Sequence, residues 1–272
     1  MTAEFSPEAK PAVDEFGLVL DCMSRSLTVD LIASRPLQTC NGDEIAQAVF
    51  RRTGFGGIDQ VPVLLQGSIA GVLQRNSAEA SAEPASACMR GLSEVMLVES
   101  TTGILPYVHL AAESPYHLVV KRERIDGIVT RSDLLKLPVR LVLFAYLTHL
   151  ESTMASVIRR RCPDESWRRH LNHTRRSRLE GALRLGQRGN VYVEPLCYTQ
   201  WCDKRTILAA VLYEGLPEAE VTFNDELRQL ETLRHRVMHT NEYLTDPRQL
   251  SALLRTAESR ILHLESQADP RR

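Results

Sequence analysis

The chain has 272 residues, of which 43% are hydrophobic and 25% charged, and its formal net charge is −1. This length is enough for about two domains with sizeable cores, and the balanced charge excludes a uniformly basic nucleic-acid-binding protein. Six scattered cysteines show no paired Cys-x-x-Cys spacing, which excludes a disulfide scaffold and favours reduced thiols in a cytoplasm.

Residues 1–25 are predicted to form an N-terminal arm. The first part carries Pro7, Pro11 and several charges, which is typical of loose segments. It lacks a basic start followed by an apolar run, so we expect no secretion signal. Leu18 to Met23 could form a short helix or strand that docks on the next unit. No stretch reaches the about 18 uncharged apolar residues of a membrane span, so we expect no membrane contact. The expected location, from the reduced thiols, is cytoplasmic.

Two segments, 63–75 and 119–131, repeat the same pattern. Each predicts two short strands around a tight turn, followed by the start of a helix. Upstream, a helical stretch over 44–52 matches another over 103–112. This self-similarity indicates one supersecondary unit used twice, and since each copy is too small to bury its own core, the copies should pack face to face. One constant offset pairs Val63 with Val119, Ile69 with Ile125, Gly71 with Gly127 and Arg75 with Arg131.

The repeat resembles a tandem pair of CBS domains. The likeness rests on Val61-Pro62-Val63 before the first hairpin and on Gly127-Ile128-Val129-Thr130-Arg131-Ser132-Asp133-Leu134 after the second. It covers residues 26–136, with copies over 26–80 and 88–136. The resemblance implies an α+β fold that binds an adenosine-containing nucleotide in a cleft between the copies.

The resemblance also implies roles for Thr130, which would face the phosphates, and for Asp133, which would hold the ribose hydroxyls. A carboxylate is a good acceptor for a vicinal diol, and donors at a helix start suit phosphate. The first copy has Gln74 and Ser77 at the matching positions, so we expect at most one such site. The expected regulatory ligand is ATP, ADP, AMP or a related adenosyl compound. The alternative is that Asp133 only begins a helix and binds no ligand.

Residues 137–266 predict an all-α helical bundle, with a disordered tail over 267–272. Pro138 suits the first turn of a helix. Glu151 lies near the middle of that helix; it could face a cleft, but an exposed position is the safer reading. Further helices are predicted to start at 203–209 and to run over 249–264. The helix over 139–158 carries one apolar stripe, made of Leu143, Leu147, Leu150, Met154 and Val157.

The span 159–188 has a lopsided charge, with ten arginines against three acids. Arginine forks grip phosphate oxygens and their planes stack on bases, so the span is a candidate RNA-binding surface. A solvated helix face is the alternative, since most charge runs are solvated. His170, His173 and Cys162 lack a fourth ligand at suitable spacing, so we expect no metal site. The residues expected to contact RNA are Arg159, Arg160, Arg161, Arg168, Arg169, Arg175 and Arg176.

An amphipathic helix is predicted from a cap at Asn224 to about Met238. Arg234 and His239 lie near its end, and five helical steps would place them about 140° apart. They converge only if the helix stops near Met238 and His239 lies on the following loop. Otherwise Arg234 is an exposed side chain and His239 stabilises the helix end. The apolar residues fall three or four apart and are Phe223, Leu227, Leu230, Leu233 and Val237.

The stretch Leu233-Arg234-His235-Arg236-Val237-Met238-His239 resembles the Arg-x-x-x-x-His signature of HEPN domains, small helical domains common in RNA-cleaving toxins and defence proteins. This chain departs from the commonest form, because His235 stands where Asn usually follows the Arg. The resemblance implies a symmetric homodimer with the site between protomers. His239 would act as general acid or base without a metal, Arg234 would stabilise charge on the phosphorane, and His235 could tune the protonation of His239.

Two functions follow from the sequence. The leading hypothesis is an adenine-nucleotide-regulated, metal-independent endoribonuclease that cleaves RNA through a cyclic phosphate, in a toxin or defence setting. The alternative is a non-catalytic CBS nucleotide sensor whose helical domain serves dimerisation or partner binding, and the departure at His235 favours it.

Overall fold

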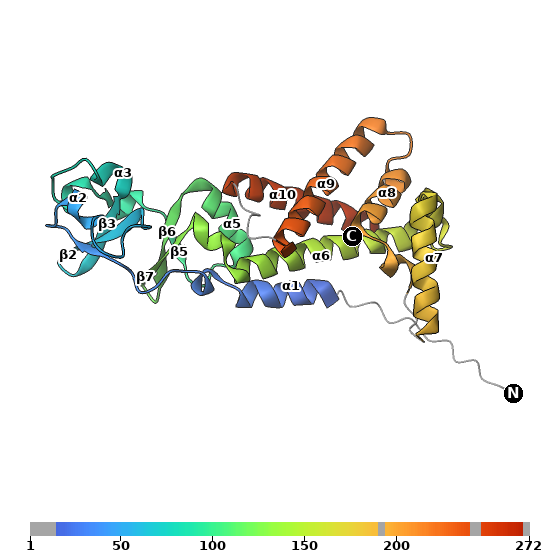
Figure 1. Cartoon of the computed structure of the whole chain (residues 1–272), viewed down its shortest axis with the longest axis horizontal. Coiled ribbons are helices and arrows are strands. Elements are labelled where there is room, and N and C mark those ends of the chain that lie inside the picture. Colours follow the sequence, from blue (N-terminus) through green and yellow to red (C-terminus); the bar gives the residue numbers. More distant parts are fainter. Residues whose placement is uncertain (1–14, 190–193, 240–245, 269–272) are drawn as a thin grey trace. The chain divides into compact units, whose positions relative to one another are not determined.

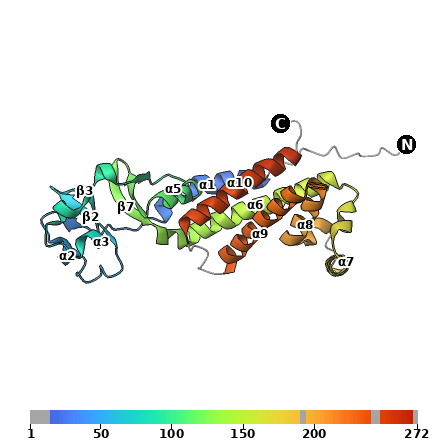
Figure 2. The same ribbon diagram turned by 90° about the horizontal axis from the view of Figure 1, so that it is seen from above.

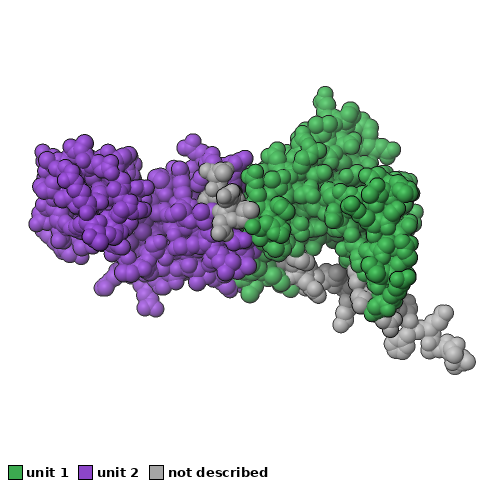
Figure 3. Space-filling model, in the orientation of Figure 1, with its two compact units in different colours: residues 1–23, 143–243, 252–272 green, residues 24–142, 244–251 purple. Residues whose placement is uncertain are grey.

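The structure, a computed structural model, describes residues 15–189, 194–239 and 246–268. The chain divides into two compact units, shown in purple and green in Figure 3. Residues 24–142 and 244–251 form the repeat unit, and residues 1–23, 143–243 and 252–272 form the helical unit. The changeover falls at residues 142 and 143, inside the long helix α6 (Leu137–Arg161), whereas the sequence alone placed a boundary just before that helix.

The repeat unit contains two sheets, one from each copy of the repeat (Figure 1). The strand order is β1-β2-β3-β4 in one sheet and β5-β6-β7 in the other. The first copy comprises η1 (Val29–Leu31), β1 (Cys40–Asn41), α2 (Ala46–Val49), β2 (Gln60–Leu65), β3 (Ser68–Gln74) and α3 (Arg75–Ala78). The following elements are α4 (Ala85–Cys88), β4 (Arg90–Gly91), η2 (Leu92–Glu94), β5 (Leu97–Glu99), α5 (Ile104–Glu113), β6 (Tyr116–Lys121), β7 (Arg124–Thr130) and η3 (Arg131–Leu135).

The predicted repeat is confirmed down to the irregularities of its hairpins. In both copies a short parallel strand, β1 or β5, pairs with an antiparallel hairpin, β2–β3 or β6–β7. A register shift falls between Val63 and Leu64 in the first hairpin and between Val119 and Val120 in the second. Because these positions are equivalent in the repeat, the two hairpins share one geometry. The α+β fold expected for this part of the chain is therefore present.

The two copies bury apolar surface against each other, as the sequence predicted. One cluster of buried side chains joins Val72 of the first copy to Val95, Tyr116 and Leu118 of the second. A separate cluster fills the first copy and contains Cys40, Ala46, Val49, Phe50, Phe55, Val61, Val63, Leu73, Ala78 and Ala85. Burial between the copies gives each small unit the core that it could not build alone.

The helical unit is all-α over the described residues. Figure 2 shows α6, α9 and α10 side by side, and ion pairs join α6 to α9 and α9 to α10. Its elements, counting helices that it shares with the repeat unit, are α1 (Glu15–Ser26), α6, η4 (Ser166–His170), α7 (His173–Arg188), η5 (Pro195–Tyr198), α8 (Trp201–Leu212), α9 (Pro217–His239) and α10 (Pro247–Ala268).

Both predicted apolar stripes are buried. All five stripe residues of α6 are fully buried, and all five predicted residues of α9 are buried. Among the described residues, α6 is the one helix whose length and composition would allow it to cross a membrane. However, 56% of the most apolar 18-residue stretch of α6 is buried inside the protein, as in the core helix of a bundle.

Three expectations need correction. Helix α9 begins at Pro217, so Asn224 lies inside it and is no cap. The same helix includes His239, so the expected loop position of that residue is wrong. Helix α10 extends through Ala268, which leaves only 269–272 of the expected disordered tail, outside the described residues. Leu18 to Met23, predicted as a short helix or strand, lie in helix α1, and residues 1–14 of the expected arm lie outside the described residues.

Candidate functional site

A cavity of about 440 Å³, which we call the Thr130 cavity, lies between the two copies of the repeat unit. The segment before β1 is pinned to β7 by two backbone hydrogen bonds, from Ser34 N to Ile128 O at 2.8 Å and from Ile128 N to Ser34 O at 3.3 Å. This pairing brings a segment of the first copy against the end of β7. The walls are residues 34–38, 57–60, Pro62, Ile128, Thr130 and Ser132.

Of the two predicted nucleotide-binding residues, Thr130 lines this cavity and Asp133 is not among its lining residues. Asp133 is 5% exposed, and its carboxylate accepts hydrogen bonds from Thr130 N at 2.6 Å and Thr130 Oγ1 at 2.9 Å. Lys136 Nζ lies 2.7 Å from Asp133 Oδ1, and Ser34 Oγ donates to the same oxygen at 3.4 Å. The carboxylate therefore holds Thr130 in place and caps the start of η3.

A cation in the cavity wall, Arg35, was missed by the sequence analysis. Its Nη2 lies 2.8 Å from Asp30 Oδ1 and 3.0 Å from Asp126 Oδ1, a residue 91 positions away in the chain. The hydrogen bond to Asp126 and the charges of both acids raise the pKa of Arg35. The pKa of Asp30 is lowered, first by the hydrogen bond from Lys121. A partner so distant in sequence leaves no local pattern from which the cluster could have been predicted.

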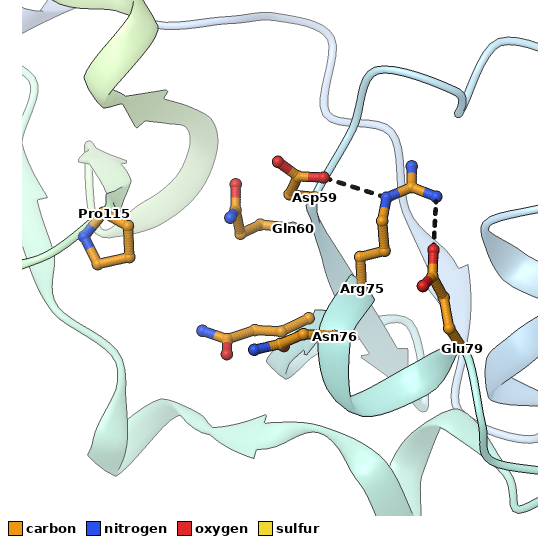
Figure 4. Close-up of a pocket in the computed structure, with 7 residues that line it drawn as sticks. Asp59, Gln60, Arg75, Asn76, Glu79 and Pro115 are labelled. Carbon is orange, nitrogen blue, oxygen red and sulfur yellow. Dashed lines mark hydrogen bonds and ion pairs between the residues drawn. The ribbon is translucent and has the colours of Figure 1, made fainter. Parts of the chain in front are cut away.

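A second cavity, of about 360 Å³, lies at the matching place in the first copy, and we call it the Gln74 cavity (Figure 4). Gln74 and Asn76 line it, where Thr130 and Ser132 line the other cavity. Ser77, the counterpart of Asp133, is not among its lining residues and donates to Gln74 O at 2.9 Å. A cavity thus lies at the matching place in each copy, with different side chains.

Arg234 of the helical unit is held by an ion pair and two rings. Its Nη2 lies 3.1 Å from Glu151 Oε2, and its guanidinium carbon lies 6.0 Å from the Phe144 ring centre and 5.8 Å from that of Trp201. Lys204, only 5% exposed, donates to Glu151 Oε1 at 3.1 Å. The expectation that Glu151 is exposed is wrong, because 18% of its side chain is accessible and both carboxylate oxygens have cationic partners.

His235 and His239 form a pair at the end of α9. Both are exposed, and their ring centres lie 4.6 Å apart. Arg234 contacts Glu151, Phe144 and Trp201, whereas His239 remains in the helix, so within one chain the described contacts do not bring the predicted catalytic pair together.

The arginines predicted to contact RNA are largely engaged within the protein. Arg160 is exposed at the end of α6, and Arg169 donates to His170 at 3.2 Å. Five others have partners: Arg159 pairs with Glu194, Arg161 with Gln267, Arg168 with Glu165, Arg175 with Asp203, and Arg176 with the carbonyls of Arg168 and Leu171. RNA contact stays a prediction, and it would require several of these groups to exchange partners.

The described residues contain no group of three or more His, Cys, Asp and Glu side chains arranged to hold a metal ion. Cys162 is buried, and the pKa of His170 is lowered by burial and by the neighbouring Arg169. The side chains considered as possible metal ligands in the sequence are therefore not assembled into a site.

Comparison with known proteins finds solved structures of CBS domains. No protein-family model matches the chain, and no curated protein matches it. A signal-transduction protein with CBS domains from Burkholderia ambifaria is 18% identical, with a TM-score of 0.35, over 40% of this chain and 91% of that chain. CBSX2, from Arabidopsis thaliana, in complex with AMP is 14% identical, with a TM-score of 0.36, over 42% of this chain and 97% of that chain.

A third structure is the CBS domain of a bacterial CNNM/CorC Mg²⁺ transporter in complex with ATP. It is 14% identical, with a TM-score of 0.36, over 47% of this chain and 97% of that chain. All three of these structures are described as containing CBS domains.

Proposed function

We propose that the chain is a nucleotide-responsive regulatory protein whose repeat unit binds one adenine nucleotide in the Thr130 cavity. The observation that carries the proposal is the cavity itself, in which a guanidinium, hydroxyl groups and apolar side chains converge. Its volume of about 440 Å³ is within the range of small-molecule sites. Such a mixture suits a ligand with an anionic end and a flat aromatic end.

In this proposal the phosphates lie beside Arg35 and the hydroxyls of Thr130 and Ser132. Arg35 offers a planar fork suited to phosphate oxygens, and the acids that now hold it keep it oriented. Pro36 and Ile128, also in the wall, provide apolar surface for the base. The ribose would reach Asp133 only if its carboxylate exchanges a present partner for the diol.

Calorimetry tests this assignment directly. The full chain is titrated with AMP, ADP and ATP, and we expect one site per chain. Thr130→Val keeps the side-chain shape and removes the hydroxyl, so it should weaken binding about tenfold, the cost of roughly one lost hydrogen bond. Thr222→Val, the same change on exposed α9, is the matched control and should bind as the wild type does. Absence of binding, or equal binding by Thr130→Val, would refute the assignment.

The helical unit would then serve dimerisation or partner binding. Support comes from exposed apolar side chains on its helices, among them Leu185 at 68%, Val221 at 61% and Leu262 at 68% exposure. Light scattering with and without saturating AMP measures whether the chain self-associates and whether the ligand changes its state.

RNA cleavage is a second candidate, favoured by one observation. Arg234 is oriented by Glu151 yet keeps 34% of its side chain exposed, as a group that receives a phosphate must. Because Arg234 and His239 lie in the same helix without facing each other, a catalytic site would form between two chains, and each chain would contribute its own Arg234 and His239.

The test is incubation of the full chain with mixed RNA in the presence of a chelator. If His239 is a general acid or base, His239→Ala should lower the rate of RNA cleavage about 100-fold or more. Arg228→Ala, at an exposed position earlier on α9, should have little effect. Cleavage that survives His239→Ala in a folded protein would exclude this candidate.

A further inference from the structure

The last turns of α9 carry two imidazoles on one exposed face. Because α9 continues through His239, His235 and His239 stand four residues apart in the same α-helix. Residues with this spacing are neighbours on a helix surface. The centres of the two rings lie 4.6 Å apart, with 48° between the ring planes. A helix that ended at Met238 would have placed His239 on the following loop, away from this face.

Burial of the opposite face of α9 fixes the direction of this histidine pair. Leu233 and Val237 are 3% and 1% exposed, so they anchor the last two turns of α9 in the helical unit. The geometry of the helix places both of them on the side away from the two histidines. His235 and His239 are both exposed. The pair is therefore held on a packed helix and faces solvent, where a small ligand can reach it.

The ring nitrogens of the pair are available to a ligand. In the part of the chain that the structure describes, each imidazole contacts the other and has no hydrogen bond or ion pair. A neutral imidazole has one ring nitrogen that accepts, and this is the nitrogen that binds metal ions. Exposed side chains can change rotamer, so the two accepting nitrogens can both be directed at one ion.

The chemistry of two imidazoles selects the class of ion. Imidazole suits Zn²⁺, Ni²⁺ and Cu²⁺, whereas Mg²⁺ and Ca²⁺ prefer oxygen ligands. Two histidines at positions i and i+4 of one helix are a recurrent arrangement for binding zinc. In zinc proteases a Glu follows the first of these histidines and acts as a general base, whereas this chain has Arg236 there. The pair therefore suits the binding of a metal ion and lacks the base for metal-assisted hydrolysis.

The end of the helix adds a field that favours a cation. His239 is the last residue of α9, and the free carbonyls of a helix C-terminus carry partial negative charge. Arg236, three residues before His239, opposes this field, and water screens its charge. Glu231, one turn before His235, is paired with Arg205 at 2.8 Å. The described residues place no third His, Cys, Asp or Glu side chain beside the pair, so water would complete the coordination.

We propose that His235 and His239 form a two-histidine site for a divalent transition-metal ion, of which Zn²⁺ is the expected one. The residue that departs from the common form of the Arg-x-x-x-x-His signature, His235, then supplies the second ligand. An ion held by both rings would occupy the nitrogen that His239 needs for proton transfer, so it would oppose RNA cleavage. The proposal is independent of nucleotide binding in the Thr130 cavity and of whether the chain cleaves RNA.

Calorimetry of the full chain with Zn²⁺ and with Ni²⁺ tests the site, and we expect one ion per chain that Mg²⁺ does not displace. His235→Asn and His239→Ala should each weaken binding about 100-fold, because loss of one ligand removes the advantage of chelation. His173→Ala, a change at an exposed histidine of α7, is the matched control and should bind as the wild type does. Circular dichroism confirms that each variant is folded.

A double variant and thermal denaturation give a second test. Because each single change already breaks the chelate, His235→Asn combined with His239→Ala should bind only slightly more weakly than either alone. Zn²⁺ should raise the midpoint of thermal unfolding more in the wild type than in His239→Ala. The proposal is overturned if neither ion binds, or if either single variant keeps the wild-type affinity. It is also overturned if Cys197→Ser, at an exposed thiol, removes the binding instead.

Discussion

The guanidinium of Arg234 lies 3.1 Å from the carboxylate of Glu151, Nη2 to Oε2. The other oxygen of Glu151 accepts from Lys204, whose amino group is almost fully buried and also donates to Thr199 O at 2.7 Å. One carboxylate therefore balances two cations from α8 and α9. Removing it leaves Lys204 buried without a counter-charge, and such losses are far larger than those of surface ion pairs.

We therefore expect Glu151→Ala to lower the free energy of unfolding by about 3 kcal/mol. Urea denaturation followed by circular dichroism measures the change. Glu151→Gln, which keeps the shape and one acceptor, should lose less. The control is Asp225→Ala, which breaks the ion pair between Asp225 and Arg228. Because 55% of the Asp225 side chain and 63% of the Arg228 side chain are accessible, this change should lower the free energy of unfolding by less than about 1 kcal/mol. An equal effect of Glu151→Ala and Asp225→Ala would show that the bridge contributes no more than a surface pair.

The tight turn of the second hairpin holds a non-glycine residue in a left-handed conformation. Glu123 has φ 62°, where the equivalent position of the first hairpin is Gly67 with φ 80°. A side chain costs about 1 kcal/mol in this region, whereas glycine adopts it freely. Glu123→Gly should therefore raise the free energy of unfolding by about 0.5–1 kcal/mol, as measured by urea denaturation. The converse change, Gly67→Glu, should lower it by a similar amount, and a loss of stability in Glu123→Gly would contradict the argument.

The buried side chain of His117 in β6 should make the stability of the protein depend on pH. It is 1% exposed, packs edge-on against Tyr107 at 5.5 Å between ring centres, and has no hydrogen bond at either ring nitrogen among the described residues. Burial lowers the pKa of His117, although the charge of Glu113 opposes this effect. Below the ordinary histidine value of about 6.5 the unfolded chain binds a proton that the folded chain does not, so stability falls as the pH falls.

His117→Phe replaces the imidazole with an apolar aromatic ring and removes this titration. Between about pH 7 and about pH 5 the free energy of unfolding should fall less in the variant than in the wild type. The pKa values of His170 and His263 are also lowered by burial, so the variant should keep part of the dependence. Denaturation curves at several pH values check this, and identical pH profiles would show that His117 is protonated equally in both states.

The buried faces of the long helices could be predicted residue by residue, because burial on a helix follows spacing alone. The beginning of α9 could not. Residues 217–222 carry no apolar face, and Val221 there is 61% exposed. That turn is favoured by Pro217 at the start and by Glu218 and Glu220 beside the positive helix end, which are weak local signals. The partners of Glu151 could not be predicted from the sequence either, because Lys204 is 53 residues away in the chain.

One part of the candidate nucleotide site could likewise be predicted from the sequence, and another part could not. The motif around Thr130 was visible, because the repeat itself marks the position after each second strand. Its opposite wall, with Arg35 and Gln60, depends on how the copies pack, and packing brings together residues with no common spacing. Asp133 begins η3, as the alternative from the sequence held, and its contacts with Thr130 and Lys136 are local, since each lies three residues away. Its contact with Ser34, 99 residues away in the chain, depends on the fold.

Asp133 should therefore contribute to folding as well as to ligand binding. Asp133→Ala removes the cap of η3 and leaves Lys136 without its partner at 2.7 Å. Loss of a helix cap typically costs about 1 kcal/mol, so we expect the free energy of unfolding to fall by about 1–2 kcal/mol without ligand. Asp133→Asn keeps the shape and one acceptor oxygen, so it should retain more of the stability.

Thermal denaturation with and without saturating AMP separates the contribution of Asp133 to folding from its contribution to ligand binding, because a ligand that binds only the folded state raises its stability according to its affinity. If Asp133 only positions Thr130, Asp133→Asn should preserve most of the stabilisation by AMP, whereas direct contact with the ribose predicts that both variants lose it. An Asp133→Ala protein as stable as the wild type would contradict the capping role.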